Sequence, residues 1–460
     1  MPYNAIWQMY YKVLSDYMKA AGEKMDCLIG LDIGTSSVKA VLTDLGGKMV
    51  SSKSKKYSYY FENGFKLLNA DEFCDICFEV IKELVCELPQ NSNIAALCAS
   101  GASGNLMFVK NGESCSPVYG WQNKIEEKII NKHLSGLTAE DVYNTVGWPK
   151  INSFPLAVLA NIKEKSPELI STADTVCMHI EYLNYKLTGK WGITVSMGTP
   201  FYLINQKTGS YNKEYLNIFG IEERQLPPIM DNCAVLGGIR SFAAEKTGLS
   251  EGTPVVLGTF DHPSAARGAG VFDEKQSLLS CGTSWVLLIP FADRATPLSK
   301  NMLVDRFMYP NVNWCGMVSL SSVSEKIKIY IEKYLGDISD KEFDELAEKS
   351  VCGANGLTIE LSEGNLNQYN KSDIARAIME SIAKELADML KKANVTVDEI
   401  IAVGGITNSA IWIRVISEIT GKKIKVVNGE HAGAVGAAIM AGVGAGIFKN
   451  EKEAFQSRGD

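Results

Sequence analysis

Short apolar runs that end in polar turns recur along the chain. The first, residues 27–33 (CLIGLDI), ends at a turn containing Gly34, Thr35 and Ser36, and a second run follows at 38–45 (VKAVLTDL). Apolar runs of this length between glycine-containing turns predict strands. Further strands are predicted at residues 48–52, 94–99, 254–260, 277–290 (two strands around a turn), 400–405 and 423–427.

Between the predicted strands, the apolar residues follow helical spacing. Asn69 precedes a helix expected to run to about Leu88, since asparagine is a favoured residue at a helix start. A long amphipathic helix is predicted over 372–393, and a helix ends at Gly189. The uncharged run 432–448 is rich in glycine and alanine and falls short of the ~20 apolar residues of a membrane span, so we expect a buried, tightly packed helix.

The tripeptide Gly-Thr-Ser occurs twice in the same setting. Gly34-Thr35-Ser36 and Gly282-Thr283-Ser284 each lie in a turn between two apolar strands. A repeated tripeptide alone is weak evidence, but the shared setting indicates two related halves. The length of 460 residues also favours two domains, since a chain of this length is too long for a single hydrophobic core of ordinary size. We predict a domain over 26–270 and another over 271–460, with 1–25 as a dispensable helical extension.

Composition narrows the class of protein. Hydrophobic residues make up 46% and charged residues 22%, as in a globular protein, and the net charge of -7 argues against a nucleic-acid binder. The eleven cysteines are scattered and odd in number, which predicts reduced thiols and a cytoplasmic location. Cys74 and Cys77 form a C-x-x-C motif, but they share a helical face with apolar residues, which favours core packing over metal binding.

The first candidate site is the segment from Asp32 to Lys39. Successive backbone N–H groups of a glycine turn, together with the hydroxyls of Thr35 and Ser36, can hold phosphate oxygens. A carboxylate beside those phosphates is a suitable ligand for hydrated Mg²⁺. The alternative is an ordinary hairpin in which Asp32 and Thr35 satisfy the turn backbone.

The second candidate is Asp261, between a strand and a helix. Aspartate is a favoured N-cap and proline is common in a first helical turn, so Asp261-His-Pro could be a plain helix start. Alternatively, Asp261 could be a general base for a substrate hydroxyl. A third candidate, Gly404-Gly405 with Ser409, could let a flat ring approach the backbone or could simply pack a helix against a strand.

Taken together, these segments resemble the FGGY family of carbohydrate kinases, in a xylulokinase-like form, over nearly all of residues 27–448. Four other segments support the resemblance: Tyr182–Gly189, Thr247–Val255, Arg376–Glu380 and Ala402–Ser409. The resemblance implies an α/β fold with two ribonuclease H-like domains and an ATP cleft between them, as in the actin-like ATPases. ATP and Mg²⁺ are the implied cofactors.

The resemblance also implies roles for individual residues. Asp261 would be the catalytic base, and Asp32 would lie near Mg²⁺. The turns Gly34, Thr35, Ser36 and Gly282, Thr283, Ser284 would contact phosphates, and Gly404, Gly405 and Ser409 would lie beside the adenosine. These roles come from similarity to the family.

The sequence departs from the family where the sugar would bind. A Gln-Met-His-Gly-like stretch is replaced by Ala102-Ser103-Gly104-Asn105, and Trp-x-Asp-x-Arg by Trp121-Gln-Asn123-Lys-Ile125. An amide can still donate and accept hydrogen bonds, so Trp121 and Asn123 are predicted substrate contacts together with Asp261. A core tryptophan is the alternative for Trp121.

We therefore expect ATP-dependent phosphorylation of a hydroxyl on a sugar, ketose or polyol, with a pentulose such as xylulose as one option. The alternatives are an ATPase that needs no sugar and a non-catalytic sugar sensor of the same fold. A small-molecule sugar and ATP are the expected partners, with neither nucleic acid nor membrane. A homodimer is an arrangement that the sequence leaves open.

Overall fold

The computed structural model describes residues 25–282, 284–308, 313–359, 366, 369–427 and 429–458. The predicted extension 1–25 lies outside this range except for Met25, the first residue of β1. The chain forms two compact units. The first consists of the described residues within Met1–Gly270, Asp305–Val312 and His431–Asp460, and the second of those within Val271–Val304 and Asn313–Glu430.

The first unit is built on a six-stranded sheet of order β15-β16-β6-β1-β2-β3. Strands β1, β2 and β3 form an antiparallel meander, while β6 runs parallel to β1 and β16 runs parallel to β6. The strands are β1 (Met25–Ile33), β2 (Ser37–Asp44), β3 (Met49–Lys56), β6 (Ser92–Gly101), β15 (Val235–Gly238) and β16 (Pro254–Phe260).

Helices α2 (Ala70–Cys86), α11 (Asp261–Gly268) and α17 (Ala432–Gly444) pack on this sheet. The side chain of Asn69 accepts hydrogen bonds from the N–H groups of Asp71 and Glu72, so the predicted start of α2 is confirmed. Cys74 and Cys77 are buried on the inner face of α2, as predicted. All eleven cysteines are free.

Smaller elements complete the first unit. Its helices are α3 (Glu127–Leu134), α4 (Ala139–Val146), α5 (Phe154–Lys165), α6 (Pro167–Thr172), α7 (His179–Thr188), α8 (Val195–Phe201), α9 (Lys213–Phe219), η1 (Glu223–Gln225), α10 (Ser241–Thr247) and α18 (Glu451–Gln456). Its short strands are β4 (Tyr60–Glu62), β5 (Phe65–Leu68), β7 (Met107–Lys110), β8 (Glu113–Ser114), β9 (Val118–Tyr119), β10 (Thr175–Cys177), β11 (Ile193–Thr194), β12 (Ile204–Asn205), β13 (Ser210–Tyr211) and β14 (Ile229–Met230).

The second unit repeats the plan of the first. Its sheet has the order β19-β20-β18-β17-β21-β22, in which β17, β18 and β20 form an antiparallel meander and β21 and β22 continue in parallel. The strands are β17 (Gln276–Cys281), β18 (Trp285–Phe291), β19 (Leu303–Arg306), β20 (Trp314–Leu320), β21 (Glu399–Gly404) and β22 (Lys423–Val426).

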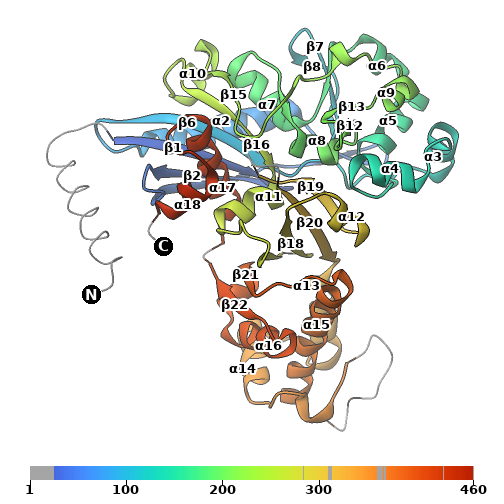
Figure 1. Cartoon of the computed structure of the whole chain (residues 1–460), viewed down its shortest axis with the longest axis vertical. Helices are drawn as coiled ribbons and strands as arrows, with labels where there is room; N and C mark the ends of the chain where they lie inside the picture. Colours follow the sequence, from blue (N-terminus) through green and yellow to red (C-terminus); the bar gives the residue numbers. More distant parts are fainter. Residues whose placement is uncertain are drawn as a thin grey trace. The chain divides into compact units, whose positions relative to one another are not determined.

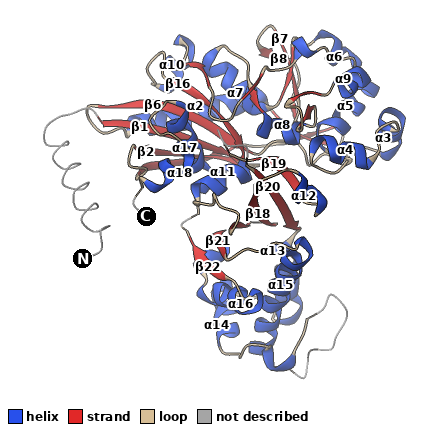
Figure 2. Ribbon diagram, in the orientation of Figure 1, coloured by secondary structure: helices blue, strands red, loops and turns tan. Residues whose placement is uncertain are grey.

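The helical elements of the second unit are α12 (Ala295–Ser299), α13 (Val323–Tyr334), α14 (Asp340–Glu348), η2 (Ala354–Gly356), α15 (Lys371–Ala393), η3 (Gly405–Asn408) and α16 (Ala410–Thr420). Figure 2 shows α14, α15 and α16 grouped together, and α15 packs against both neighbours. The predicted long helix over 372–393 is therefore confirmed as α15.

The second unit does not extend to the end of the chain, as the predicted domain over 271–460 does. The first and second units separate after Gly270, but the described residues from His431 onward and those within 305–312 belong to the first unit. Figure 1 shows the reason, because helix α17, near the end of the chain, lies against β1 and β6 of the first sheet. A Cβ atom at Gly30 would lie 1.9 Å from the Ala434 carbonyl oxygen, so glycine in β1 allows this close packing.

Helix α17 is buried along its whole length from Ala432 to Val443, which confirms the predicted packed helix. Of the helices within the described residues, none has both the length and the apolar character needed to cross a membrane.

Candidate active site

The structure brings Asp32 and Asp261 to the same edge of the first sheet. Asp32 is the penultimate residue of β1 and pairs with Ser100 in β6, while Phe260 at the end of β16 pairs with Gly101. Because β1, β6 and β16 run parallel, their carboxyl ends meet at one edge. Asp261 follows Phe260 directly and therefore lies at this edge beside Asp32.

The charge of Asp261 acts on Asp32. Burial, and next the negative charge of Asp261, raise the pKa of the Asp32 carboxyl from 3.8 to about 7, while Lys39 opposes the shift. Lys39 is the cross-strand partner of Asp32 on β2. Within the described residues, no hydrogen bond to the Asp32 carboxylate lowers this pKa. Because two neighbouring carboxylates repel each other when both are ionised, this pair favours a bound cation or a shared proton.

Asp261 does not cap its helix. It is the first residue of α11, whose N-cap is Phe260, and no side chain of a described residue makes the capping hydrogen bond. The Asp261 carboxylate accepts one hydrogen bond, from the backbone N–H of His262 at 2.9 Å. The N-cap interpretation is therefore wrong, and the carboxylate retains acceptor capacity for a ligand.

Helix α17 supports both acids through small residues. A Cβ atom at Gly433 would lie 2.4 Å from Oδ2 of Asp32, and one at Gly436 would lie 1.8 Å from the carbonyl oxygen of Ser264 in α11. The Ser264 hydroxyl donates to the Gly433 carbonyl at 2.8 Å. Glycine is therefore required where α17 meets the strand of Asp32 and the helix of Asp261.

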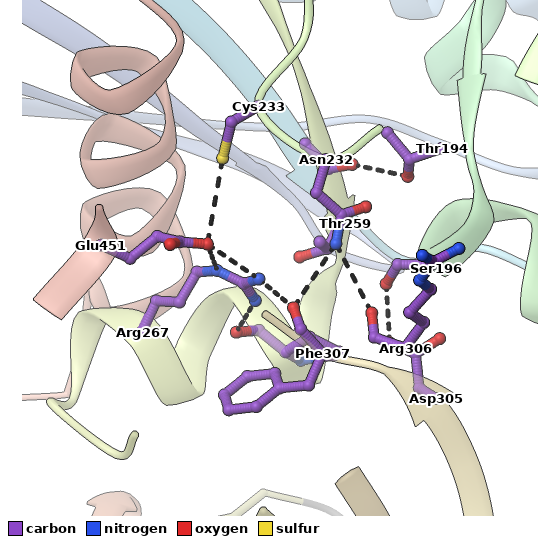
Figure 3. Close-up of polar contacts among 12 residues, drawn as sticks. Thr194, Ser196, Asn232, Cys233, Thr259, Arg267, Asp305, Arg306, Phe307 and Glu451 are labelled. Atoms are coloured by element: carbon purple, nitrogen blue, oxygen red, sulfur yellow. Dashed lines mark hydrogen bonds and ion pairs between the residues drawn. The ribbon is translucent and has the colours of Figure 1, made fainter. Parts of the chain in front are cut away.

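A buried arginine fixes the other end of α11 (Figure 3). Arg267 and Glu451 are both fully buried, and the guanidinium Nε and Nη2 atoms lie 3.4 Å from Oε1 of Glu451. Arg267 also donates to the carbonyls of Pro263, at 2.9 Å, and of Phe307, and its guanidinium lies 4.9 Å from the Phe307 ring centroid. Because a buried charge is costly without partners, these contacts hold α11 in one position.

The segment that carries Phe307 has a second anchor. Asp305 is fully buried, and its two carboxylate oxygens accept hydrogen bonds of 2.8 Å from the hydroxyls of Ser196 and Thr199. Burial raises the pKa of Asp305 to about 7. Asp305 is therefore a structural group, because its two hydrogen bonds hold the segment of Asp305 and Phe307 against α8.

The turn after β1 is closed by hydrogen bonds to its backbone. The Gly34 N–H donates to the Ser37 carbonyl at 2.9 Å, and the Tyr57 hydroxyl donates to the Gly34 carbonyl. Thr35 and Ser36 are exposed at the tip of the turn. These contacts hold the backbone, so the hydroxyls at the tip remain open to solvent.

In the second unit, two glycine turns lie side by side. Cys281, at the end of β17, pairs with Gly404 at the end of the parallel strand β21, so Gly282 and Gly405 follow at the same edge. Gly404 has φ of +102°, and a Cβ atom there would lie 2.4 Å from the Cys281 carbonyl oxygen. Gly405, in contrast, faces open space, as a surface for a flat ring requires.

The other predicted nucleotide contacts in this unit have structural partners. Ser284 accepts a hydrogen bond from the N–H of Ser322 at 3.2 Å, and the Ser324 hydroxyl donates to the Gly282 carbonyl at 2.9 Å. Ser409 is the N-cap of α16 and accepts from the Trp412 N–H at 3.3 Å. Thr283 lies outside the described residues.

The two predicted sugar contacts differ in exposure. Trp121 has 39% of its surface exposed, so the core alternative is wrong for it. Asn123 is buried, and its amide donates to the carbonyls of Lys66 and Gly120 at 2.9 and 3.1 Å and accepts from the Lys66 N–H at 2.7 Å. Both amide hydrogens of Asn123 are used, which leaves one lone pair of its oxygen for a ligand.

Asn105, in the loop after β6, is also engaged. Its oxygen accepts from the His179 N–H at 3.0 Å, and its Nδ2 lies 2.9 Å from Nδ1 of His179. Burial lowers the pKa of His179 to about 3, so the ring is neutral and its Nδ1 can accept this hydrogen bond. The altered loop is therefore held by an internal pair of side chains.

The donor set suits magnesium better than a transition metal. No group of three or more histidine, cysteine or acidic side chains within the described residues is arranged to hold a metal. Asp32, with Asp261 beside it, offers one or two carboxylates, and Mg²⁺ is commonly bound in that way, with water and phosphate completing its shell. A carboxylate whose pKa is raised by burial and by a neighbouring acid fits such an ion.

Comparison with known proteins agrees with this geometry. Residues 27–268 match the model of the N-terminal domain of the FGGY family of carbohydrate kinases, and residues 347–445 match that of its C-terminal domain. The chain is 27% identical over 448 residues to a xylulose kinase of Staphylococcus epidermidis, covering 92% of this chain and 89% of the relative. It is 24% identical to an autoinducer-2 kinase of an Enterobacter species, covering 93% and 87%.

A solved structure shows the same fold. The crystal structure of Plasmodium falciparum glycerol kinase with ADP superposes with a TM-score of 0.85 at 17% identity, covering 95% of this chain and 93% of that one. The predicted two-domain α/β architecture of the actin-like ATPases is therefore confirmed. Since the N-terminal family model alone spans more than half of the chain, this protein belongs to the FGGY family of carbohydrate kinases and is an ATP-using phosphotransferase.

Proposed function

We propose that this kinase transfers the terminal phosphate of MgATP to a hydroxyl of a small sugar or polyol, with a pentulose such as xylulose as the first acceptor to test. The observation that carries the proposal is the pair Asp32 and Asp261 at one edge of the first sheet. One carboxylate beside a glycine turn and a second without a capping role are what phosphoryl transfer to a hydroxyl needs.

Asp261 would act as the general base. Its carboxylate keeps acceptor capacity beyond the single hydrogen bond from His262, so it can orient the acceptor hydroxyl and take its proton during transfer. The fixed position of α11, held by α17 and Arg267, would aim the carboxylate. A positioned base of this kind contributes a rate factor of about 10²–10⁴.

Asp32 would hold Mg²⁺, through water or directly. When bound, Mg²⁺ neutralises charge that develops on the transferring phosphate. The turn of Gly34, Thr35 and Ser36 would contact the terminal phosphate from the first unit. The pKa of Asp32, raised to about 7, would fall on cation binding, because a nearby positive charge favours the ionised carboxylate.

The second unit would bind the nucleotide. The turn at Gly282 and Ser284 and the turn at Gly404 and Gly405 would supply N–H groups for phosphates and an open backbone face for adenine, with Thr283 as a further predicted phosphate contact. Ser409 would contribute through its place at the start of α16. Its hydroxyl accepts the capping hydrogen bond and also hydrogen-bonds the Asp344 carboxylate, so Ser409 would act by fixing the start of α16 beside the nucleotide.

Trp121 and Asn123 would contact the acceptor. The exposed indole suits the C–H face of a sugar, and Asn123 would use the free lone pair of its amide oxygen. The S. epidermidis relative named as a xylulose kinase supports a pentulose acceptor. The free thiols favour a cytoplasmic location, where such thiols stay reduced.

The test is ADP release with MgATP across ketopentoses, ketohexoses, sugar acids and polyols. We expect one acceptor class to stimulate release strongly, with D-xylulose among the best. If a folded protein that binds ATP released ADP slowly and no acceptor changed the rate, a sugar-independent ATPase or a sugar sensor would replace this proposal.

A further inference from the structure

Phe154, the first residue of α5, has an unfavourable backbone conformation. Its φ is +57°, in the left-handed region that bulky side chains rarely adopt. The next residue is Pro155, whose ring disfavours the ordinary helical conformation at the preceding position. Such a conformation persists only where the surroundings enforce it, and it is typical of ligand-binding positions.

Aromatic rings surround the Phe154 side chain. Its ring stacks on Trp121 with centroids 6.2 Å apart and an interplanar angle of 26°, and it meets the edge of Trp148 at 5.7 Å. On another side, a Cβ atom added at Gly104 would lie 2.5 Å from the Phe154 ring. The ring of Phe154 therefore needs glycine at position 104, because any side chain there would collide with it.

A second aromatic residue of the same cluster has the same backbone strain. Tyr202, at the end of α8, has φ of +66°, and its ring lies 5.4 Å from that of Phe154. Tyr202 is fully buried, and its hydroxyl donates to the Pro149 carbonyl at 2.8 Å. Tyr202 therefore supports the ring of Phe154 from the buried part of the cluster, and Trp121 is its exposed member.

The cluster leads to the catalytic edge. Trp148 contacts the ring of Phe260 at 5.8 Å, and Phe260 directly precedes Asp261. Gly104, which lies against Phe154, belongs to the loop that leaves β6 after Gly101, and Gly101 pairs with both Ile33 and Phe260. The Trp121–Phe154 stack is thus joined by ring and backbone contacts to the edge where Asp32 and Asp261 meet.

The loop carrying Trp121 is fastened on both sides. Asn123 bridges to the backbone of Lys66, and the Ile125 N–H donates to the Asn152 carbonyl at 2.7 Å, two residues before Phe154. These contacts fix Trp121 relative to Phe154. They also use both amide hydrogens and one oxygen lone pair of Asn123, while His179 takes one amide hydrogen and one oxygen lone pair of Asn105. With few free polar groups on these two amides, the rings offer the larger contact surface for an acceptor at this place.

We propose that Phe154 is a specificity-determining residue of the acceptor site, where it and Trp121 form an aromatic wall for the C–H face of a sugar or sugar acid. This inference rests on the proposed kinase function and names how that site selects its acceptor. The backbone strain at Phe154 is retained because it directs the ring into the wall. An acceptor of five or six carbons gains from the wall, whereas glycerol is too short to cover both rings.

The test compares Phe154→Gly with the wild-type protein, because glycine removes the ring and relieves the positive φ together. Turnover and calorimetric binding are measured with D-xylulose, D-gluconate and glycerol as probes. We expect the KM and Kd of the better five- or six-carbon probe to rise about ten-fold, the upper range for loss of one stacking contact. The corresponding values for glycerol and ATP should change less than two-fold.

Two further variants isolate the ring from the backbone. Phe154→Tyr keeps an aromatic face and should retain the wild-type KM within about two-fold, whereas Phe154→Leu keeps apolar bulk and should behave like Phe154→Gly. Asn394→Gly in the second unit, also at positive φ (+46°), controls for relief of strain alone and should change no KM.

The outcomes separate this inference from the proposed function. If the wild-type protein binds a five- or six-carbon probe without phosphorylating it, and Phe154→Gly loses that binding, the wall stands and the kinase proposal fails. A folded Phe154→Gly or Phe154→Leu variant with wild-type KM and Kd for these probes would overturn the wall. So would a wild-type protein that binds neither D-xylulose nor D-gluconate.

Discussion

Five strands of each sheet in this protein share one plan, but the residues at their carboxyl edges differ. In the first unit, β1, β2, β6 and β16 take the places that β17, β18, β21 and β22 take in the second. The register of β1 with β6 matches that of β17 with β21, since Ile33 lies opposite Gly101 and Cys281 lies opposite Gly404, while the hairpin that follows is one residue shorter in the second unit. The carboxyl ends of β1 and β6 can therefore be compared residue by residue with those of β17 and β21.

Charge distinguishes the two edges. Asp32, with Lys39 and Ser100 as its cross-strand partners, corresponds to Ser280, whose partners are Val286 and Val403. Asp261 follows β16, whereas a valine follows β22. The same backbone therefore presents ionisable groups in one unit and a neutral, glycine-lined surface in the other. Proton transfer and cation binding are expected at the first edge, and nucleotide binding at the second.

Glycine is the feature that both edges keep. Gly101 has φ of +154° and a Cβ atom there would lie 2.2 Å from the Ile33 carbonyl oxygen, while Gly404 has φ of +102° and the corresponding distance to Cys281 is 2.4 Å. Any side chain at either position would collide with the neighbouring strand. These two glycines serve the shared fold, so the functional differences lie in the residues around them.

The largest expected effect is loss of the acid that has no counterpart in the second sheet. Asp261→Asn should lower kcat about 10³-fold, because the amide cannot take the acceptor proton, while the Kd for ADP should change little. The measurement is ADP release with the best acceptor of the panel, alongside calorimetric titration with ADP. A variant that keeps more than a tenth of the wild-type kcat would contradict the assignment of Asp261 as the base.

The next largest effect concerns Asp32 and its counterpart Ser280. Asp32→Asn should lower kcat/KM about 100-fold by weakening Mg²⁺ binding, whereas Ser280→Ala should leave it within about two-fold. The Mg²⁺ concentration for half-maximal rate should rise for the first variant alone. Equal losses in both variants would remove the contrast between a charged edge and a neutral one.

Asp32 also predicts a pH dependence of stability. Its pKa in the folded protein is raised from 3.8 to about 7, so the folded state binds the proton more tightly than the unfolded state. Its contribution to stability is full below about pH 4 and is lost as the pH rises through about 7. The amide introduced by Asp32→Asn stays uncharged, so the Tm of this variant relative to wild type should rise between pH 5 and pH 8 by roughly 3 °C.

This shift is measured by thermal denaturation without Mg²⁺ or nucleotide. Adding Mg²⁺ with ADP should stabilise the wild-type protein at pH 8 and have less effect on Asp32→Asn, since the ion would neutralise the carboxylate. A Tm difference that stays constant across this pH range would show that Asp32 does not lie in a buried setting beside a second negative charge.

Much of this arrangement could be predicted from local patterns. The strand and turn signals around Gly34 lie within a few residues, and so do those around Gly282. The strand–helix junction at Asp261 is equally local. The return of α17 to the first unit could not be predicted, because the pattern of residues 432–448 shows a packed helix without showing its partner. The one local signal for this packing is Gly30 in β1, where the absence of a side chain lets α17 approach the strand.

The engaged amides and the strained ring were also beyond the sequence. Asn123 bonds Lys66 and Asn105 bonds His179, which are 57 and 74 residues away, and no local spacing reports such pairs. Phe154 looks like an ordinary residue before Pro155, because its positive φ depends on the rings of Trp121 and Tyr202 packing around it. Tertiary contacts decided these positions, as is common at binding sites.

The smallest expected effect distinguishes the glycines of the second edge. Gly405 has open space where a Cβ atom would stand, so Gly405→Ala should fold normally and place a methyl group in the path of the adenine ring. We expect the Kd for ADP to rise about ten-fold, as for a few lost ring contacts, with Tm within about 2 °C of wild type. Gly136→Ala, also at an open position but in the first unit, is the control and should leave the Kd for ADP unchanged.

Gly404→Ala is the matching variant at the neighbouring glycine, and it should affect stability where Gly405→Ala affects ADP binding. Its Cβ atom would meet the Cys281 carbonyl in a backbone conformation that alanine rarely adopts, so Tm should fall clearly before any effect on ADP is considered. If Gly405→Ala instead lowered Tm as much as Gly404→Ala, both glycines would be packing residues. If Gly405→Ala bound ADP like the wild type, the nucleotide would lie elsewhere on the second unit, and the contrast between the two edges would lose its nucleotide side.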